Sequence, residues 1–82
     1  MNYPVLFEQI VSPDFPTGHY YAHLPALGLT THGQGIEGAR AAAIDLALLW
    51  IAEKAANGES VNVPGACLLG IVEISDDALQ SA

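Results

Sequence analysis

The feature that most constrains this chain is an almost wholly apolar run over residues 41–52, in which Asp45 is the only polar side chain. Its alanines and leucines favour a helix, which we predict to begin near Ile36 and to end at Asn57-Gly58. A surface helix of a globular protein shows an apolar stripe of roughly 100°. Here apolar side chains cover nearly the whole circumference, so we expect two apolar neighbours: the chain's own sheet, and either a second copy or a different protein.

Four segments have the composition of β-strands. The first three are Tyr3–Val11, His19–Leu24 and Leu29–His32, separated by segments rich in Pro, Gly and Ser. The segment Ala66–Ile74 is nearly continuous in apolar character, which is typical of a strand covered on both faces. In that strand, Cys67 is expected to behave as a small buried hydrophobic residue.

The predicted order is therefore β-β-β-α-β, an α+β fold. Three strands form an antiparallel meander, and a right-handed crossover through the helix places the fourth strand parallel to the first, in the order 3-2-1-4. Residues 1–74 make a single domain, and the polar, acidic residues 75–82 are expected to fray. With one helix on one face, the sheet keeps an open face and an open edge, which favours a homo-oligomer, either a dimer or a tetramer.

The charge of the chain narrows the classes of partner. Nine Asp or Glu residues stand against Arg40 and Lys54 alone, a net charge of -7. No basic cluster is present to neutralise phosphates, so direct nucleic-acid binding is not expected. The acidic surface either favours encounter with basic proteins or merely keeps a hydrophobic small domain in solution.

The sequence also predicts a cytoplasmic protein that does not enter membranes. The N-terminal segment lacks the Lys and Arg residues with which a secretory signal begins. The apolar run around Asp45 is shorter than the roughly 20 residues that cross a bilayer.

No catalytic, metal or cofactor site is predicted. His19 and His23 have the spacing of helical zinc ligands, but on a strand they lie about 13 Å apart and cannot share an ion within one subunit. Glu8 and Glu73 are the only carboxylates that could come from neighbouring strands, and exposed sheet surface explains them better than metal-dependent hydrolysis does. We therefore expect a protein that is not an enzyme.

The candidate contact residues lie mainly on the helix. Ile44, Leu48 and Ile51 form one stripe, which is predicted to contact a partner or another copy. Trp50 either fills the gap between helix and sheet or anchors an interface. Phe15 either folds back over the sheet edge or is an exposed contact. The other helical stripe, expected to pack inward, comprises Ile36, Ala39, Ala43, Leu46 and Trp50.

An ordered set of residues also suggests a family. In sequence order the set is Tyr3 and Pro4, Gly18 with Tyr20 and Tyr21, Pro25, Leu27 and Gly28, Thr31 and Gly33, and then Ile36, Glu37, Ala39 and Trp50. Over about residues 2–60 this pattern resembles the HicB-like antitoxin family.

The resemblance implies a degenerate, partial RNase H-like domain that binds and blocks HicA, a small basic toxin that cleaves RNA, through a strand edge or a helix face. Family members usually append a helix-turn-helix or ribbon-helix-helix segment, which these 82 residues do not contain, so operator binding is not expected. The alternative is a free-standing homo-oligomeric domain with no toxin partner and an unknown ligand.

Overall fold

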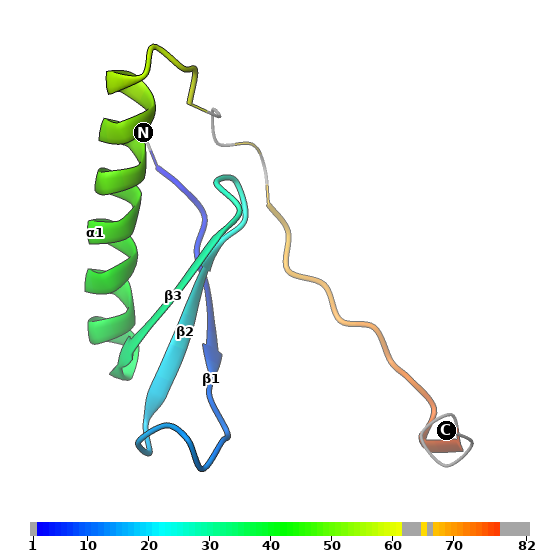
Figure 1. The fold of residues 1–82 in the computed structure, drawn as a ribbon. Coiled ribbons are helices and arrows are strands. Elements are labelled where there is room, and N and C mark those ends of the chain that lie inside the picture. Colours follow the sequence, from blue (N-terminus) through cyan, green and yellow to red (C-terminus); the bar gives the residue numbers. More distant parts are fainter. Residues whose placement is uncertain (1, 62–64, 66, 78–82) are drawn as a thin grey trace.

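The computed structural model describes residues 2–61, 65 and 67–77 (Figure 1). Its elements follow the order β1 (Leu6–Gln9), β2 (His19–Leu24), β3 (Leu29–Gln34) and α1 (Gly35–Ala56). The three strands form one antiparallel sheet in the order β1-β2-β3, and α1 lies along one face of it. The expected α+β class, the antiparallel meander and the single long helix are confirmed.

The register of the strands decides which side chains meet the helix. Phe7 of β1 is paired with Ala22 of β2, and Leu24 is paired with Leu29 of β3. Because successive residues of a strand point to opposite faces, these side chains share the face toward α1. The opposite face carries Tyr21 and the other odd-numbered residues of β2.

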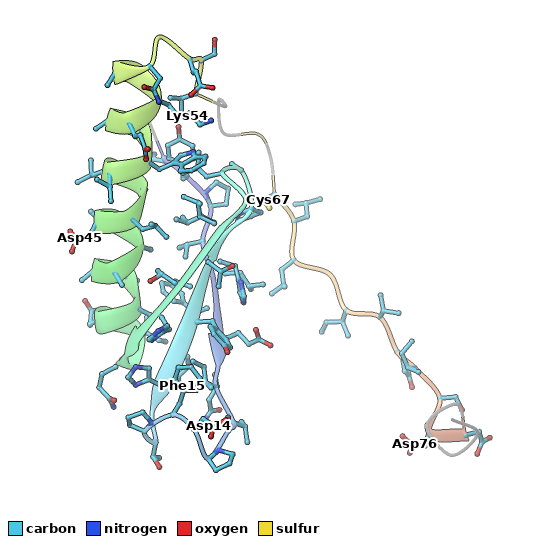
Figure 2. The ribbon with its side chains drawn as sticks, in the orientation of Figure 1. Asp14, Phe15, Asp45, Lys54, Cys67 and Asp76 are labelled. Carbon is cyan, nitrogen blue, oxygen red and sulfur yellow. The ribbon has the colours of Figure 1, made fainter. Side chains whose placement is uncertain are left out.

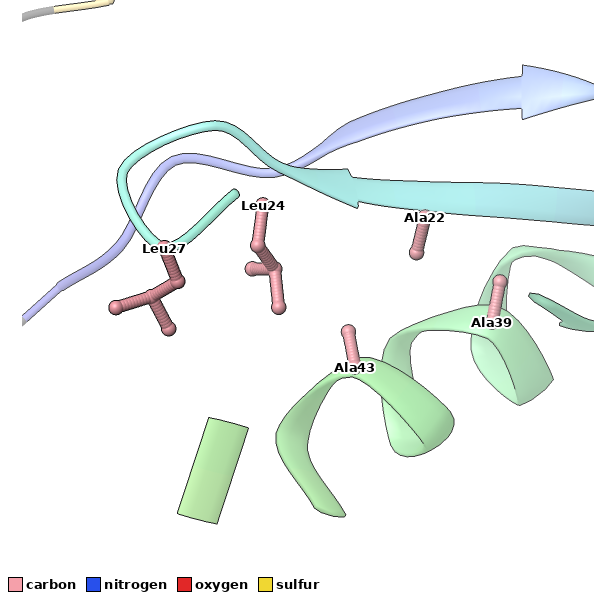
Figure 3. Packing of buried hydrophobic residues seen from close by; sticks show 5 residues of the cluster. All are labelled: Ala22, Leu24, Leu27, Ala39 and Ala43. Atoms are coloured by element: carbon pink, nitrogen blue, oxygen red, sulfur yellow. The ribbon is translucent and has the colours of Figure 1, made fainter. Parts of the chain in front are cut away.

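The core between sheet and helix is built from small side chains. Ala22 and Leu24 from β2 and Leu27 from the following turn meet Ala39 and Ala43 of α1 (Figure 3). All five are buried, and Ala22 and Ala39 are fully so. Alanines on both sides let the helix approach the sheet closely, which leaves little volume for large apolar residues to fill.

The closest approach of helix and sheet lies at two glycines. A Cβ atom placed on Gly33 of β3 would lie 2.4 Å from the carbonyl carbon of Gly38. Next to this contact, the backbone N–H of Gly35 donates a 2.8 Å hydrogen bond to the carbonyl of Gly18, which ties the start of α1 to the loop before β2. Gly35 has a backbone φ of +66°, a conformation that residues other than glycine rarely adopt. The entry angle of the helix is thus set by backbone contacts.

The predicted fourth strand is wrong. Ala66 lies outside the described residues, and residues 67–75 form no strand; they leave the body as an extended chain (Figure 1). Among the described residues the sheet therefore has the order β1-β2-β3 instead of 3-2-1-4, without a parallel strand. The apolar pattern gives the segment the composition of a strand, but a strand also needs a hydrogen-bonded neighbour, and the pattern does not specify one. Of the predicted frayed tail, residues 78–82 lie outside the described residues.

Candidate interaction surfaces

One side of α1 carries large apolar side chains that the sheet does not cover. We call Ile44, Leu48 and Ile51 the apolar flank. Ile44 is 53% exposed and Leu48 62% exposed, while Ile51 is half-buried. Helical geometry places them together, since residues three and four apart are neighbours on a helix surface. The predicted contact stripe is thus one continuous, solvent-facing strip of the helix.

The apolar flank forms one wall of a groove. Tyr3 and Val5, in the segment that leads into β1, form the opposite wall, and the groove between them has a volume of about 460 Å³. Its floor includes Ala43, one of the buried core residues. The residues that line the groove are mostly apolar, and exposed apolar patches mark contacts with other proteins or with ligands. The sequence pattern missed Tyr3 and Val5 because they lie far from the helix along the chain.

The groove exists because α1 packs mainly on β2 and β3 and leaves β1 toward the edge. On the helix-facing side of β1, the Arg40 guanidinium lies over the ring of Phe7, with Cζ 5.5 Å from the ring centroid. Such a cation–π contact lets a charged side chain cover an aromatic ring while its head stays in water. The edge of β1 that faces away from β2 pairs with no other strand in the described part of the chain.

The sequence left two roles open for Trp50, filling the gap between helix and sheet or anchoring an interface, and its position combines features of both. It is half-buried and packs against the core cluster of Ala22 and its neighbours. The Lys54 ammonium lies 4.7 Å from the centroid of its indole ring. Lys54 in turn contacts Glu59 at 3.6 Å, just after the helix ends. Trp50 therefore closes the end of the core, and its outward side is covered by a flexible cation.

Residues 67–74 form a second exposed apolar surface, which we call the arm. Leu68 and Ile71 are each 95% exposed, and Val72 is exposed as well. Where the arm starts, Cys67, Leu68 and Leu69 line a pocket of about 270 Å³ together with Val5 and Leu6. The expectation that Cys67 is buried is wrong: its thiol is free and exposed, because the strand that would have enclosed it is not formed (Figure 2).

The sheet face opposite the helix carries a cluster of aromatic rings and imidazoles. Phe15, from the loop between β1 and β2, folds back over it (Figure 2). Its ring centroid lies 5.2 Å from that of His32, 5.8 Å from that of His19 and 6.0 Å from that of Tyr21. His19 and His32 are themselves 5.3 Å apart. We call Phe15, His19, Tyr21 and His32 the aromatic cluster, and within it Phe15 acts as a lid on this face.

The imidazoles of this face are held by neighbours on the sheet. His23 Nε2 lies 2.9 Å from Glu8 Oε1, and its Nδ1 lies 3.0 Å from the Thr30 hydroxyl. His19 Nδ1 lies 3.0 Å from Gln34 Oε1. The structure does not bring Glu8 to Glu73, which lies on the arm. In residues 2–61, 65 and 67–77, no group of three or more His, Cys, Asp or Glu side chains could hold a metal ion.

Acidic side chains lie on the outward side of the helix and in the loops. Asp45 points away from the sheet, and Asp14 lies in the loop between β1 and β2 (Figure 2). Both are exposed. No helix in the described ranges is long and apolar enough to pass through a lipid bilayer. The surface thus combines apolar strips with a large excess of negative charge.

Comparisons with models of protein families, with curated proteins and with solved structures each find no match to this chain.

Proposed function

We propose that this chain is a non-catalytic, homo-oligomeric binding module of the HicB-like antitoxin kind, acting in the cytoplasm. In the assembled protein the apolar flank is covered by another copy, and the acidic surface binds a small basic toxin that cleaves RNA and so masks it. The observation that carries the proposal is the exposed apolar flank of α1, at Ile44 and Leu48, on a chain of net charge -7. An apolar strip this exposed favours assembly, and the charge favours a basic partner.

The resemblance supplies the class of partner. It rests on residues that the structure assigns definite places: Gly33 allows the close approach of α1, and Gly28, with φ +65°, closes the turn between β2 and β3. These residues lie in the β-β-β-α part of the predicted β-β-β-α-β order, whose last strand is not formed in the described residues. Glu8, the carboxylate of β1, is engaged with His23 at 2.9 Å, which supports a binding role over a catalytic one.

The test is neutralisation of the small basic protein encoded next to this chain. The purified chain is added to that protein, and cleavage of a labelled RNA is followed with time. We expect cleavage to stop near equimolar ratio. The double substitution Asp45→Lys with Glu53→Lys, on the helix, should weaken neutralisation by about tenfold or more, because opposite charges steer and hold the pair.

The matched control is Asp14→Lys with Asp76→Lys, which makes the same change of charge away from the helix and should leave neutralisation within about twofold. Undiminished cleavage with the chain in large excess would contradict the antitoxin role. The absence of any basic neighbour would favour the alternative, a homo-oligomeric domain with a different ligand.

A further inference from the structure

The structure leaves two apolar surfaces uncovered that agree in length. One is the arm, residues 67–74, whose large side chains Leu68 and Ile71 are almost fully in water. The other is the edge of β1 with the groove beside it. We propose that two copies of this chain exchange arms: residues 67–74 of each copy lie along β1 of the other copy and fill its groove against the apolar flank.

The lengths of the two surfaces agree. The arm is as long as the segment 2–9, which comprises the groove wall at Tyr3 and Val5 followed by β1. At ~3.3 Å per residue both span about 26 Å when extended. An extended segment that joins a free sheet edge satisfies the edge's backbone groups and places alternate side chains on the helix side, as in other cases of strand addition.

The side-chain pattern of the arm fits one orientation. In an extended arm Leu68, Gly70, Val72 and Ile74 share one side, and the other side carries Cys67, Leu69, Ile71 and Glu73. Because successive side chains of a strand point to opposite faces, one side of the arm is entirely apolar. We assign that side to the groove, where Ile44 and Leu48 meet it. Glu73 then faces away from the groove, on the same side as Leu69 and Ile71.

The occupant is a second copy because the arm leads away from its own body. In the single chain Cys67 and Leu68 lie beside the chain's own Val5 and Leu6, a contact that the exchange replaces with the corresponding one on the other copy. Beyond Leu69 the arm departs, so the molecule measures 50 × 28 × 20 Å and has a radius of gyration of 16.0 Å. A compact domain of this length has a radius of gyration of about 12 Å. An arm that starts at its own β1 and extends outward can reach the same site on a neighbour, and exchange between identical chains is a low-cost route to a closed dimer.

The area is sufficient for a stable dimer. An extended chain exposes about 1.45 Å² per dalton, so the arm exposes roughly 1,200 Å². If half of that is covered, with equal area on the groove, two exchanged arms bury roughly 2,400 Å² in total, more than the ~1,600 Å² of a standard interface. The inference deepens the homo-oligomeric part of the proposed function. Its test contains no toxin, so either can fail while the other holds.

The first measurement is the mass of the full chain by light scattering at micromolar concentration, where we expect twice 8.6 kDa. Val72→Asp places a charge on the groove side of the arm, and Leu48→Asp places one in the groove. Each variant should raise the dissociation constant at least about 100-fold. Circular dichroism confirms that each variant keeps its helix.

The matched controls add the same charge close by. Leu49→Asp lies next to Leu48 on an exposed part of α1 that does not line the groove, and Ser75→Asp lies just beyond the arm. Both should stay dimeric with dissociation constants within about threefold of the parent.

Mixing separates arm exchange from the other arrangements. The Val72→Asp chain keeps an unchanged groove, and the Leu48→Asp chain keeps an unchanged arm. Only in a mixed dimer can an unchanged arm lie in an unchanged groove. We expect the mixed pair to associate at least about tenfold more tightly than either variant alone. A particle of 8.6 kDa for the parent chain, a Val72→Asp variant that remains a dimer, or no gain on mixing would each overturn the proposal.

Discussion

At the scale of single residues, two glycines face each other and have opposite roles. Gly33 of β3 has no room for a side chain, because a Cβ would lie 2.4–2.6 Å from backbone atoms of Gly38 and Ala39. Gly38 does have room: a Cβ there meets its nearest neighbour at 3.5 Å, an ordinary van der Waals contact. The strand glycine is therefore required for packing, whereas the helix glycine weakens the first turns of α1.

This difference predicts opposite changes in stability. Gly33→Ala should lower the free energy of unfolding by about 3 kcal/mol, since backbone atoms of helix and strand must move apart. Gly38→Ala should raise it by about 0.5–1 kcal/mol, because alanine favours the helix. Urea titration followed by the fluorescence of Trp50, the single tryptophan, measures both. Equal destabilisation by the two substitutions would show that the helix does not approach β3 at Gly33.

Phe15 is the residue whose place the sequence left open between lid and exposed contact. Its ring meets His32 and Tyr21 edge-on, with interplanar angles of 83° and 67°. Such aromatic pairs contribute about 0.5–1.5 kcal/mol each beyond burial. Phe15→Ala should thus lower the free energy of unfolding by about 1–2 kcal/mol.

The control for that substitution is Val11→Ala, near the start of the same loop. Val11 is 90% exposed, so its truncation should change the free energy of unfolding by less than about 0.5 kcal/mol. A Phe15→Ala variant as stable as this control would mean that the ring does not pack on the sheet in solution.

At the scale of elements, the small core makes the buried leucines important. Leu24, 5% exposed, is one of two leucines among the five buried residues between sheet and helix. Leu24→Ala should cost about 2–4 kcal/mol of the free energy of unfolding, because it leaves a cavity under α1. Leu49→Ala, on the exposed side of the helix, should cost less than about 0.5 kcal/mol. Thermal or urea unfolding at one protein concentration compares the two, and similar losses would contradict the assignment of the core to this face.

The same elements show how far the sequence predicts the fold. β2 and the helix boundaries follow from local patterns: β2 was predicted at His19–Leu24, where the structure has it, and Gly58 with φ +69° follows the end of α1. The reason why the prediction of a fourth strand failed is also informative. The apolar pattern of residues 67–74 is local, but a strand's partner is not, so the pattern could not say whether β1 of the same chain provides it.

The candidate surfaces divide in the same way. The apolar flank could be predicted because Ile44, Leu48 and Ile51 recur at helical spacing. The groove could not, because its opposite wall at Tyr3 and Val5 is brought there by the path of the chain before β1. The contact between Phe15 and His32 was likewise beyond prediction, since no periodic pattern relates a loop residue to a distant strand.

At the scale of the whole molecule, the charge of -7 opposes association between two copies of the chain and favours association with a basic partner. Two copies that exchange arms carry the same charge and repel each other, while their contact is apolar. A basic toxin is attracted. Raising NaCl from about 0.01 M to about 0.1 M shortens the screening length from about 30 Å to about 10 Å and weakens both effects.

Self-association should therefore tighten with salt, by about threefold or more in the dissociation constant, while association with the basic partner should slow and weaken. Light scattering across a dilution series measures the first, and stopped-flow mixing measures the second. The variant Asp45→Asn with Glu53→Gln carries less negative charge, so both responses should become smaller. A dimer that dissociates as salt rises would mean that ion pairs, and not the arm in its apolar groove, hold the two copies together.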